Sequence, residues 1–136
     1  MESKLGYEVH VTCKANWHDD EGPVIELEEW QRLIQEDPEL DKYDDVGPED
    51  IGKVASYGDE IGMLLWTNGE VQSKNPERSL RAKMFQIAKS LNAKVQGDDG
   101  EVYIEDGTSP ELENHVRKHS SSFFGTIFSW FQSKKP

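Results

Sequence analysis

Two histidines and a carboxylate lie at helical spacing near the carboxyl terminus of this chain: Glu111, His115 and His119. Residues four apart share one face of a helix, so these three side chains could bind one zinc ion. The zinc-protease motif requires Glu directly after its first histidine, and Val116 stands there instead. No fourth ligand accompanies the three, so we interpret them as a solvated helical face and predict no metal site and no cofactor.

A cysteine nucleophile needs a base within hydrogen-bond reach, and His10 is the histidine near Cys13 in the sequence. Alternation along a strand puts these two side chains on opposite faces, so they cannot pair directly. The acidic stretch Gly97–Gly100, followed by Glu101, lacks the alternating oxygen ligands of a calcium loop and is typical of a hairpin turn. We find neither a glycine-rich phosphate loop nor a nucleophile-elbow motif, and we expect that the protein is not an enzyme.

An aromatic cluster lies close to the carboxyl terminus. At 100° per residue its apolar side chains fall on one face of a helix; they are Phe123, Phe124, Ile127, Phe128, Trp130 and Phe131. Such a face could pack on the protein's own sheet, insert into a partner or a second copy of the chain, or bind a membrane surface. Lys134 and Lys135 favour the membrane, whereas the charge of the rest of the chain opposes it.

The distribution of charge divides the chain into two unlike parts. Residues 1–106 contain 11 Lys and Arg against 25 Asp and Glu, a formal charge of −14, and residues 107–136 carry +2. Phosphate binding requires clustered basic residues, so this balance argues against nucleic acid as a ligand. It favours either simple solubility or attraction to a basic protein partner. The acidic residues expected to contact that partner are Asp19, Asp20, Glu21, Asp41, Asp44 and Asp45.

Periodicity and turn signals predict the elements of the first half of the chain. Residues 5–13 alternate as a half-buried strand, with Glu8, His10 and Thr12 on the face away from the core. Apolar residues at helical spacing predict a helix that begins near Leu27 and ends before Pro38. The acidic residues 41–52 are typical of a loop.

The second half of the chain begins with a hairpin. Asn68-Gly69 predicts a type I′ turn between strands over 63–67 and 70–73, and residues 53–57 supply a strand before them. Asn75 is expected to cap a helix that Asn92 ends in a left-handed conformation. Short strands over 93–96 and 101–104 follow.

Together these elements indicate an α+β fold. The expected order is β-α-β-β-β-α-β-β, a single domain with a mainly antiparallel sheet, helices on one face and a C-terminal amphipathic helix. Residues 1–108 form the acidic α+β domain, and residues 109–136 form a helical, aromatic-rich and mildly basic tail.

Several stretches of the sequence resemble a recurring bacterial pattern. They are GYEVHVT (6–12), IELEEW (25–30), DPEL (37–40), KNP (74–76) and AKVQGDDGEVY (93–103). The set resembles a group of small, acidic, uncharacterised bacterial proteins, and it covers roughly the first forty residues and residues 64–103. The resemblance implies a small cytosolic bacterial protein and carries over no catalytic residue.

These features favour a binding function. No apolar run reaches the roughly 20 residues that span a bilayer, no signal segment is visible, and one cysteine fits a reducing cytoplasm. We expect a non-catalytic protein-binding module, such as an immunity protein or antitoxin, that engages a basic partner or self-associates through acidic loops and the aromatic tail. The alternatives are a cytoplasmic protein held peripherally at a membrane by its C-terminal helix, and a small metal-dependent enzyme.

Overall fold

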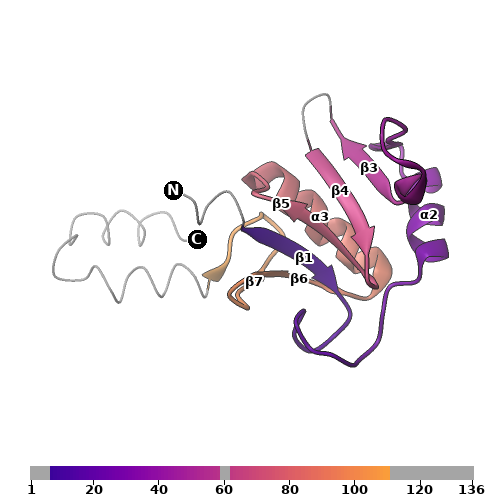
Figure 1. Ribbon diagram of the computed structural model, residues 1–136. Helices are drawn as coiled ribbons and strands as arrows, with labels where there is room; N and C mark the ends of the chain where they lie inside the picture. Colours follow the sequence, from indigo (N-terminus) through magenta and orange to yellow (C-terminus); the bar gives the residue numbers. More distant parts are fainter. Residues whose placement is uncertain (1–6, 59–61, 111–136) are drawn as a thin grey trace, which may run out of the picture.

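The computed structural model describes residues 7–58 and 62–110, which form two α-helices and a seven-stranded sheet (Figure 1). The strands are β1 (Glu8–Thr12), β2 (Leu40–Lys42), β3 (Val54–Tyr57), β4 (Gly62–Thr67), β5 (Glu70–Lys74), β6 (Lys94–Gly97) and β7 (Val102–Tyr103). The helices are α2 (Leu27–Glu36) and α3 (Arg78–Leu91), and a short 3₁₀ helix, η1, covers Pro48–Asp50.

The sheet has the strand order β2-β3-β4-β5-β1-β6-β7, and every neighbouring pair is antiparallel. The N-terminal strand β1 is therefore inserted between the β4–β5 hairpin and the β6–β7 hairpin. The expected α+β class with a mainly antiparallel sheet is confirmed. The expected C-terminal amphipathic helix lies outside the described residues.

The β4–β5 hairpin forms as its turn residues predict. Asn68 and Gly69 have φ of 52° and 81°, the positive values that a two-residue turn of this kind requires. The Gly69 carbonyl accepts a hydrogen bond of 2.8 Å from the Ile25 backbone N–H. The turn thus holds the segment that leads into α2 against the end of the sheet.

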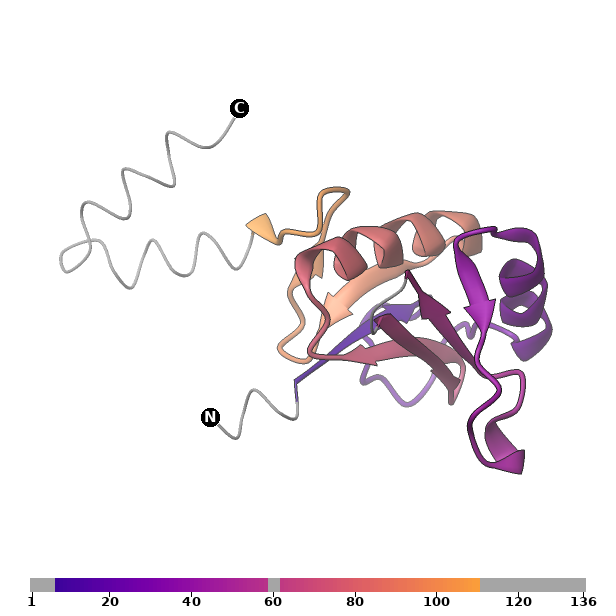
Figure 2. The same ribbon diagram turned by 90° about the horizontal axis from the view of Figure 1, so that it is seen from above.

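One hydrophobic core joins both helices to the sheet. Helix α3 lies along one face of the sheet (Figure 2) and buries Met84 and Ile87 there. Helix α2 lies beside β2 and buries Trp30 completely, while the indole Nε1–H donates to the Lys53 carbonyl at 2.9 Å. The helix that the apolar spacing predicts before Pro38 is therefore confirmed.

Two local expectations are wrong. Part of the expected loop over 41–52 forms β2, because Leu40 is buried and the backbone pairs with β3 from Leu40↔Tyr57 to Lys42↔Ala55. Asn75 does not cap α3, since the helix begins at Arg78 and Asn75 has φ of 49°. Its backbone N–H instead donates to the Tyr7 carbonyl at 2.8 Å, whereas Asn92 ends α3 in the predicted left-handed conformation.

Strand β1 is buried on both faces, which corrects the expectation of a half-buried strand. Val9 and Val11 face the helical side of the sheet, and His10 and Thr12, on the opposite side, are each only 1% exposed. Alternation assigned His10 to the correct face, but the chain after β1 folds back over that face and places Trp17 on the imidazole. A covering loop of this kind leaves no periodic signal in the strand it covers.

Candidate functional site

A buried histidine lies between two carboxylates on the face of the sheet opposite α3. His10 Nδ1 is 2.5 Å from Glu70 Oε2, and His10 Nε2 is 2.9 Å from Asp98 Oδ1. The pairing of β1 with its two neighbours explains the arrangement, because His10 lies opposite Gln72 of β5 and Gln96 of β6. Glu70 and Asp98 are two residues from these partners, so the sheet places both acids on the face of His10.

Trp17 covers this histidine. The two rings are stacked, with centroids 4.0 Å apart and planes 7° from parallel. The Trp17 backbone N–H donates to Gln96 Oε1 at 2.8 Å, and its indole N–H donates to the Asp98 carbonyl at 3.3 Å. These bonds fix the indole in place, so it shields one face of the imidazole from water.

The surroundings favour the charged form of His10. Burial alone would lower its pKa, but the hydrogen bonds to Glu70 and Asp98 outweigh burial and raise the pKa above its usual value. The stacked indole adds a cation–π attraction for an imidazolium. The arrangement stabilises a positive charge between strands β1, β5 and β6.

A third carboxylate belongs to the same cluster. Ligand atoms of Glu8, His10 and Asp98 all lie within 4.8 Å of one another, a group of side chains able to surround a metal ion. The Glu8 backbone N–H donates to Asp98 Oδ2 at 2.7 Å, which ties β1 to the turn after β6. Sequence reasoning missed this cluster, although Glu8 and His10 at a spacing of two on one strand were a signal for it.

Glu101 forms a second buried polar cluster, at the start of the last hairpin strand. It is 7% exposed, and its Oε2 accepts hydrogen bonds from the Tyr7 hydroxyl and, at 2.7 Å, from the Tyr103 hydroxyl. Burial and the bond to Glu101 raise the pKa of Tyr103 to about 12. Glu101 Oε1 has no hydrogen-bond partner among residues 7–58 and 62–110. The cluster fastens β1 to the last hairpin.

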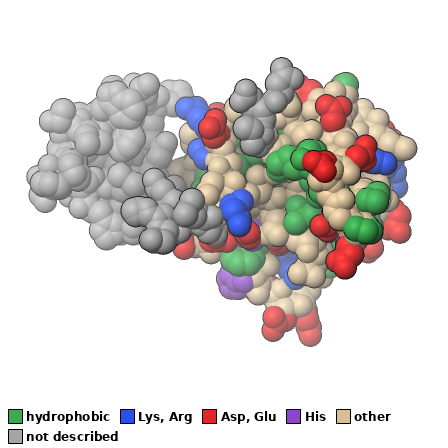
Figure 3. Space-filling model, turned by 45° about the horizontal axis from the view of Figure 1, so that its top comes forward, with side chains coloured by type: hydrophobic (Ala, Val, Ile, Leu, Met, Phe, Trp, Pro, Cys, Tyr) green, Lys and Arg blue, Asp and Glu red, His purple; other side chains and the backbone are tan. Residues whose placement is uncertain are grey.

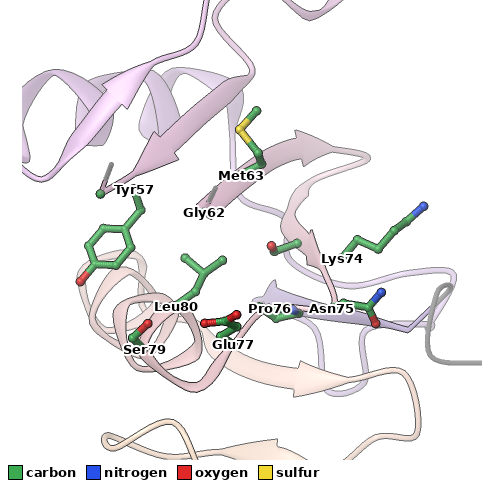
Figure 4. Close-up of a pocket in the computed structure, with 11 residues that line it drawn as sticks. Tyr57, Gly62, Met63, Lys74, Asn75, Pro76, Glu77, Ser79 and Leu80 are labelled. Atoms are coloured by element: carbon green, nitrogen blue, oxygen red, sulfur yellow. The ribbon is translucent and has the colours of Figure 1, made fainter. Parts of the chain in front are cut away.

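A cavity of about 600 Å³ opens where β3 and β5 end and α3 begins. Tyr57, Met63 and Leu80 supply apolar lining, and Figure 4 shows them around the opening. Lys74 and Glu77 are its charged lining residues, both are exposed, and Lys74 extends away from the space in Figure 4. The lining that the described residues supply therefore offers no convergent charged groups that would select a class of ligand.

The structure separates the acidic residues predicted to meet a partner. Asp19 is half-buried and accepts a hydrogen bond from the Asn16 backbone N–H at 3.1 Å, so it shapes its own loop. The others are exposed, on the loop after β1 (Asp20, Glu21) and on β2 and the loop after it (Asp41, Asp44, Asp45). Three strands lie between β1 and β2, roughly 19 Å at the usual spacing of strands. The predicted acidic residues therefore form two separate surfaces, and α2 connects the two along the chain.

The remaining predicted residues cannot be placed. The six apolar residues of the tail, and Glu111, His115 and His119, lie outside the described residues.

One continuous stretch carries the charge of the whole chain. Residues 19–50, here called the acidic segment, contain 14 Asp and Glu against Arg32 and Lys42, a formal charge of −12. Asp37 and Glu39 pair with Lys83, and the other twelve acids form no ion pair with a described residue. Figure 3 shows acidic side chains beside hydrophobic ones over the end of the molecule that carries α2 and β3.

Fold and site together define a small α+β protein with a buried histidine between two carboxylates and a strongly acidic end. Comparisons of the chain with protein-family models, with curated proteins and with solved structures find no match. Within the described residues, neither helix has the length and apolar composition needed to cross a membrane.

Proposed function

We propose that this protein is a non-catalytic protein-binding module whose acidic segment captures a basic partner. The observation that carries the proposal is the concentration of charge: 32 consecutive residues hold 14 acidic side chains, and twelve of these have no ion-pair partner within the described part of the chain. An unbalanced acidic surface attracts a basic protein and accelerates its association.

The acidic segment has the stability that a binding surface requires. Trp30 and Ile34 anchor α2 in the core, so Glu28, Glu29 and Glu36 project from a fixed helix. A binding surface assembled on a rigid element loses less conformational entropy on association than one on a mobile loop.

Exposed apolar side chains accompany the acidic ones. Val24, within the segment, is 44% exposed, and Ile51, directly after it, is 56% exposed. Apolar contact supplies affinity that charge alone does not, because exposed ion pairs contribute little. The combination supports a protein partner, since a small cation would require only the carboxylates.

The finer form of the proposal is a protein that neutralises a basic toxin, as a bacterial immunity protein or antitoxin does. In this form the aromatic tail adds apolar anchors for the same partner. A toxin-like gene beside the gene for this protein would support it.

Affinity capture from the source cells tests the proposal with three forms of the full chain. One is the unaltered protein, one carries Asp20→Asn, Asp44→Asn and Asp45→Asn, and the matched control carries three neutralised acids outside the segment (Glu77→Gln, Asp99→Asn, Glu105→Gln). Each altered form loses three charges, so non-specific charge effects are equal.

We expect the unaltered protein and the control to retain one basic partner at 1:1 stoichiometry. The acidic-segment variant should bind it at least tenfold more weakly, and 0.5 M NaCl should release it. Absence of any stoichiometric partner, or equal loss of binding in both variants, would contradict the proposal.

A further inference from the structure

We propose that Glu8, His10 and Asp98 form a binding site for a divalent ion of the zinc class, built where β1 meets the turn after β6. The three side chains place one nitrogen and two carboxylate ligands within 4.8 Å of one another. The site is independent of the acidic segment and of partner binding.

The direction of the imidazole supports a metal ligand. Glu70 Oε2 lies 2.5 Å from Nδ1 and can accept the proton there, while Nε2 faces Asp98 Oδ1 at 2.9 Å. A divalent ion that binds Nε2 and Asp98 would displace the proton shared by these two atoms, as metal binding to histidine does. A carboxylate on the far nitrogen is also how proteins orient a histidine that binds zinc.

The local charge favours a bound divalent ion. Glu8, Glu70 and Asp98 bring three negative charges to one imidazole, and a proton on His10 would leave a net charge of −2. Lys74 lies opposite Glu8 in the strand register, yet no ion pair joins them. A divalent ion on a neutral imidazole would halve the remaining charge.

Glu8 provides an observation independent of the histidine. Its side chain is half-buried, yet its carboxylate makes no hydrogen bond or ion pair within residues 7–58 and 62–110. Glu101 Oε1, not a Glu8 oxygen, is the buried unpartnered side-chain atom among the described residues, so water can reach the Glu8 carboxylate, which is free to rotate onto an ion.

The donor set selects the metal. Imidazole nitrogen with carboxylate oxygen suits Zn²⁺, whereas Mg²⁺ and Ca²⁺ prefer oxygen ligands throughout. Ligand atoms around a tetrahedral zinc ion lie about 3.3 Å apart, so the cluster must contract by a small rotation of Glu8. Asp98 is 29% exposed, which gives an ion access and lets water supply the fourth ligand.

Titration of the full chain with Zn²⁺ by calorimetry, after treatment with a chelator, tests the site. We expect 1:1 binding, weakened at least tenfold by Glu8→Gln and by Asp98→Asn, while the control Asp99→Asn in the same turn stays within twofold. Both test variants keep His10, whose removal from a buried position could unfold the protein. Mg²⁺ should not compete.

Two further measurements locate the ion. Bound Cu²⁺ should quench tryptophan emission, and Trp17→Phe should remove most of the response because Trp17 is stacked on His10. The double variant His115→Gln/His119→Gln should bind Zn²⁺ as the unaltered protein does. No Zn²⁺ binding, binding unchanged in Glu8→Gln and Asp98→Asn, or binding lost in the double variant would overturn the proposal.

Discussion

His10 shows how one residue links the two sheet hairpins. Its imidazole lies between Glu70 of β5 and Asp98 of the turn after β6. Trp17, from the loop that follows β1, stacks on the ring. Alternation in the sequence assigned His10 to the face away from the helices, and this was correct. The sequence could not show that a loop seven residues later would bury that face, because the contact depends on tertiary folding.

Replacing the indole should expose this histidine. We expect Trp17→Ala to lower the free energy of unfolding by about 2 kcal/mol. The variant lacks the stacked ring and the indole hydrogen bond to the Asp98 carbonyl, and it no longer holds the Trp17 backbone N–H against Gln96. Trp17→Phe retains a stacking ring and lacks only the indole donor, so its loss should be less than half as large. Urea unfolding measures both, and equal stability of all three proteins would show that Trp17 is not a structural cover.

At the scale of elements, the sequence predicts structure best where local chemistry decides it. The Asn68-Gly69 hairpin and the left-handed end of α3 at Asn92 were predicted because each depends on backbone angles that few residues tolerate. Strand β2 was missed because an edge strand of three residues has too few side chains to show a period. Its existence depends on pairing with β3 and on the burial of Leu40.

The hairpin turn gives a test at this scale. Gly69 has φ of 81°, and a Cβ added there would lie 2.7 Å from Val24 Cβ. Gly69→Ala should therefore destabilise the protein by about 2 kcal/mol, from backbone strain and from collision with the segment before α2. Asn68→Gly, which relaxes the neighbouring positive φ, should be nearly neutral.

A double variant separates the two causes in Gly69→Ala. Adding Val24→Gly leaves the backbone strain and removes both close contacts, with Val24 Cβ at 2.7 Å and Cγ1 at 2.8 Å, so part of the lost stability should return. If the double variant shows the sum of the two separate losses, contact between the turn and Val24 has no energetic role.

A buried ion pair connects α3 to the chain between α2 and β2. Lys83, with a side chain 4% exposed, donates to Asp37 Oδ2 at 2.8 Å and to Glu39 Oε1 at 2.5 Å. Burial would raise the pKa of Asp37, but the hydrogen bonds from Lys83 and from the Glu39 backbone N–H outweigh burial and lower the pKa below its usual value. The carboxylate of Asp37 therefore stabilises the folded protein only while it is ionised.

The pH dependence of stability should show this pair. Because the pKa of Asp37 is lower in the folded state, its contribution is complete above the unfolded value near 4 and is lost as the pH falls through the folded pKa. Between pH 5 and pH 3, we expect the unfolding free energy of the unaltered protein to fall more steeply than that of Asp37→Asn. Denaturant unfolding at several pH values measures both slopes, and parallel slopes would show that Asp37 titrates as it does in the unfolded chain.

At the scale of the whole molecule, the main property is that the net negative charge is concentrated in one segment, away from most of the sequence that forms the core. The core that α2, α3 and the sheet enclose extends along the chain from Val9 to Tyr103, while the entire net charge falls within residues 19–50. The sequence identified the acidic loops but not how they lie in space, because only the fold shows that α2 joins them. The histidine cluster had only a partial signal in the spacing of Glu8 and His10, since Asp98 joins them only when β6 pairs with β1.

Twelve carboxylates of the acidic segment form no ion pair within residues 7–58 and 62–110, and holding them in one part of the fold should make stability depend on salt. The folded state holds these charges closer together than the unfolded chain does, so screening of their repulsion favours folding. The Debye length falls from about 30 Å at 0.01 M salt to about 8 Å at 0.15 M. We therefore expect the free energy of unfolding to rise by about 1 kcal/mol between 0.01 and 0.3 M NaCl.

This rise in stability with salt should be smaller in the Asp20→Asn/Asp44→Asn/Asp45→Asn variant and unchanged in the Glu77→Gln/Asp99→Asn/Glu105→Gln control. The buried ion pairs of His10 and Lys83 are screened much less by salt, so they should not reverse this trend. If stability instead falls as NaCl is added, attraction rather than repulsion between charges dominates the electrostatics of the folded chain.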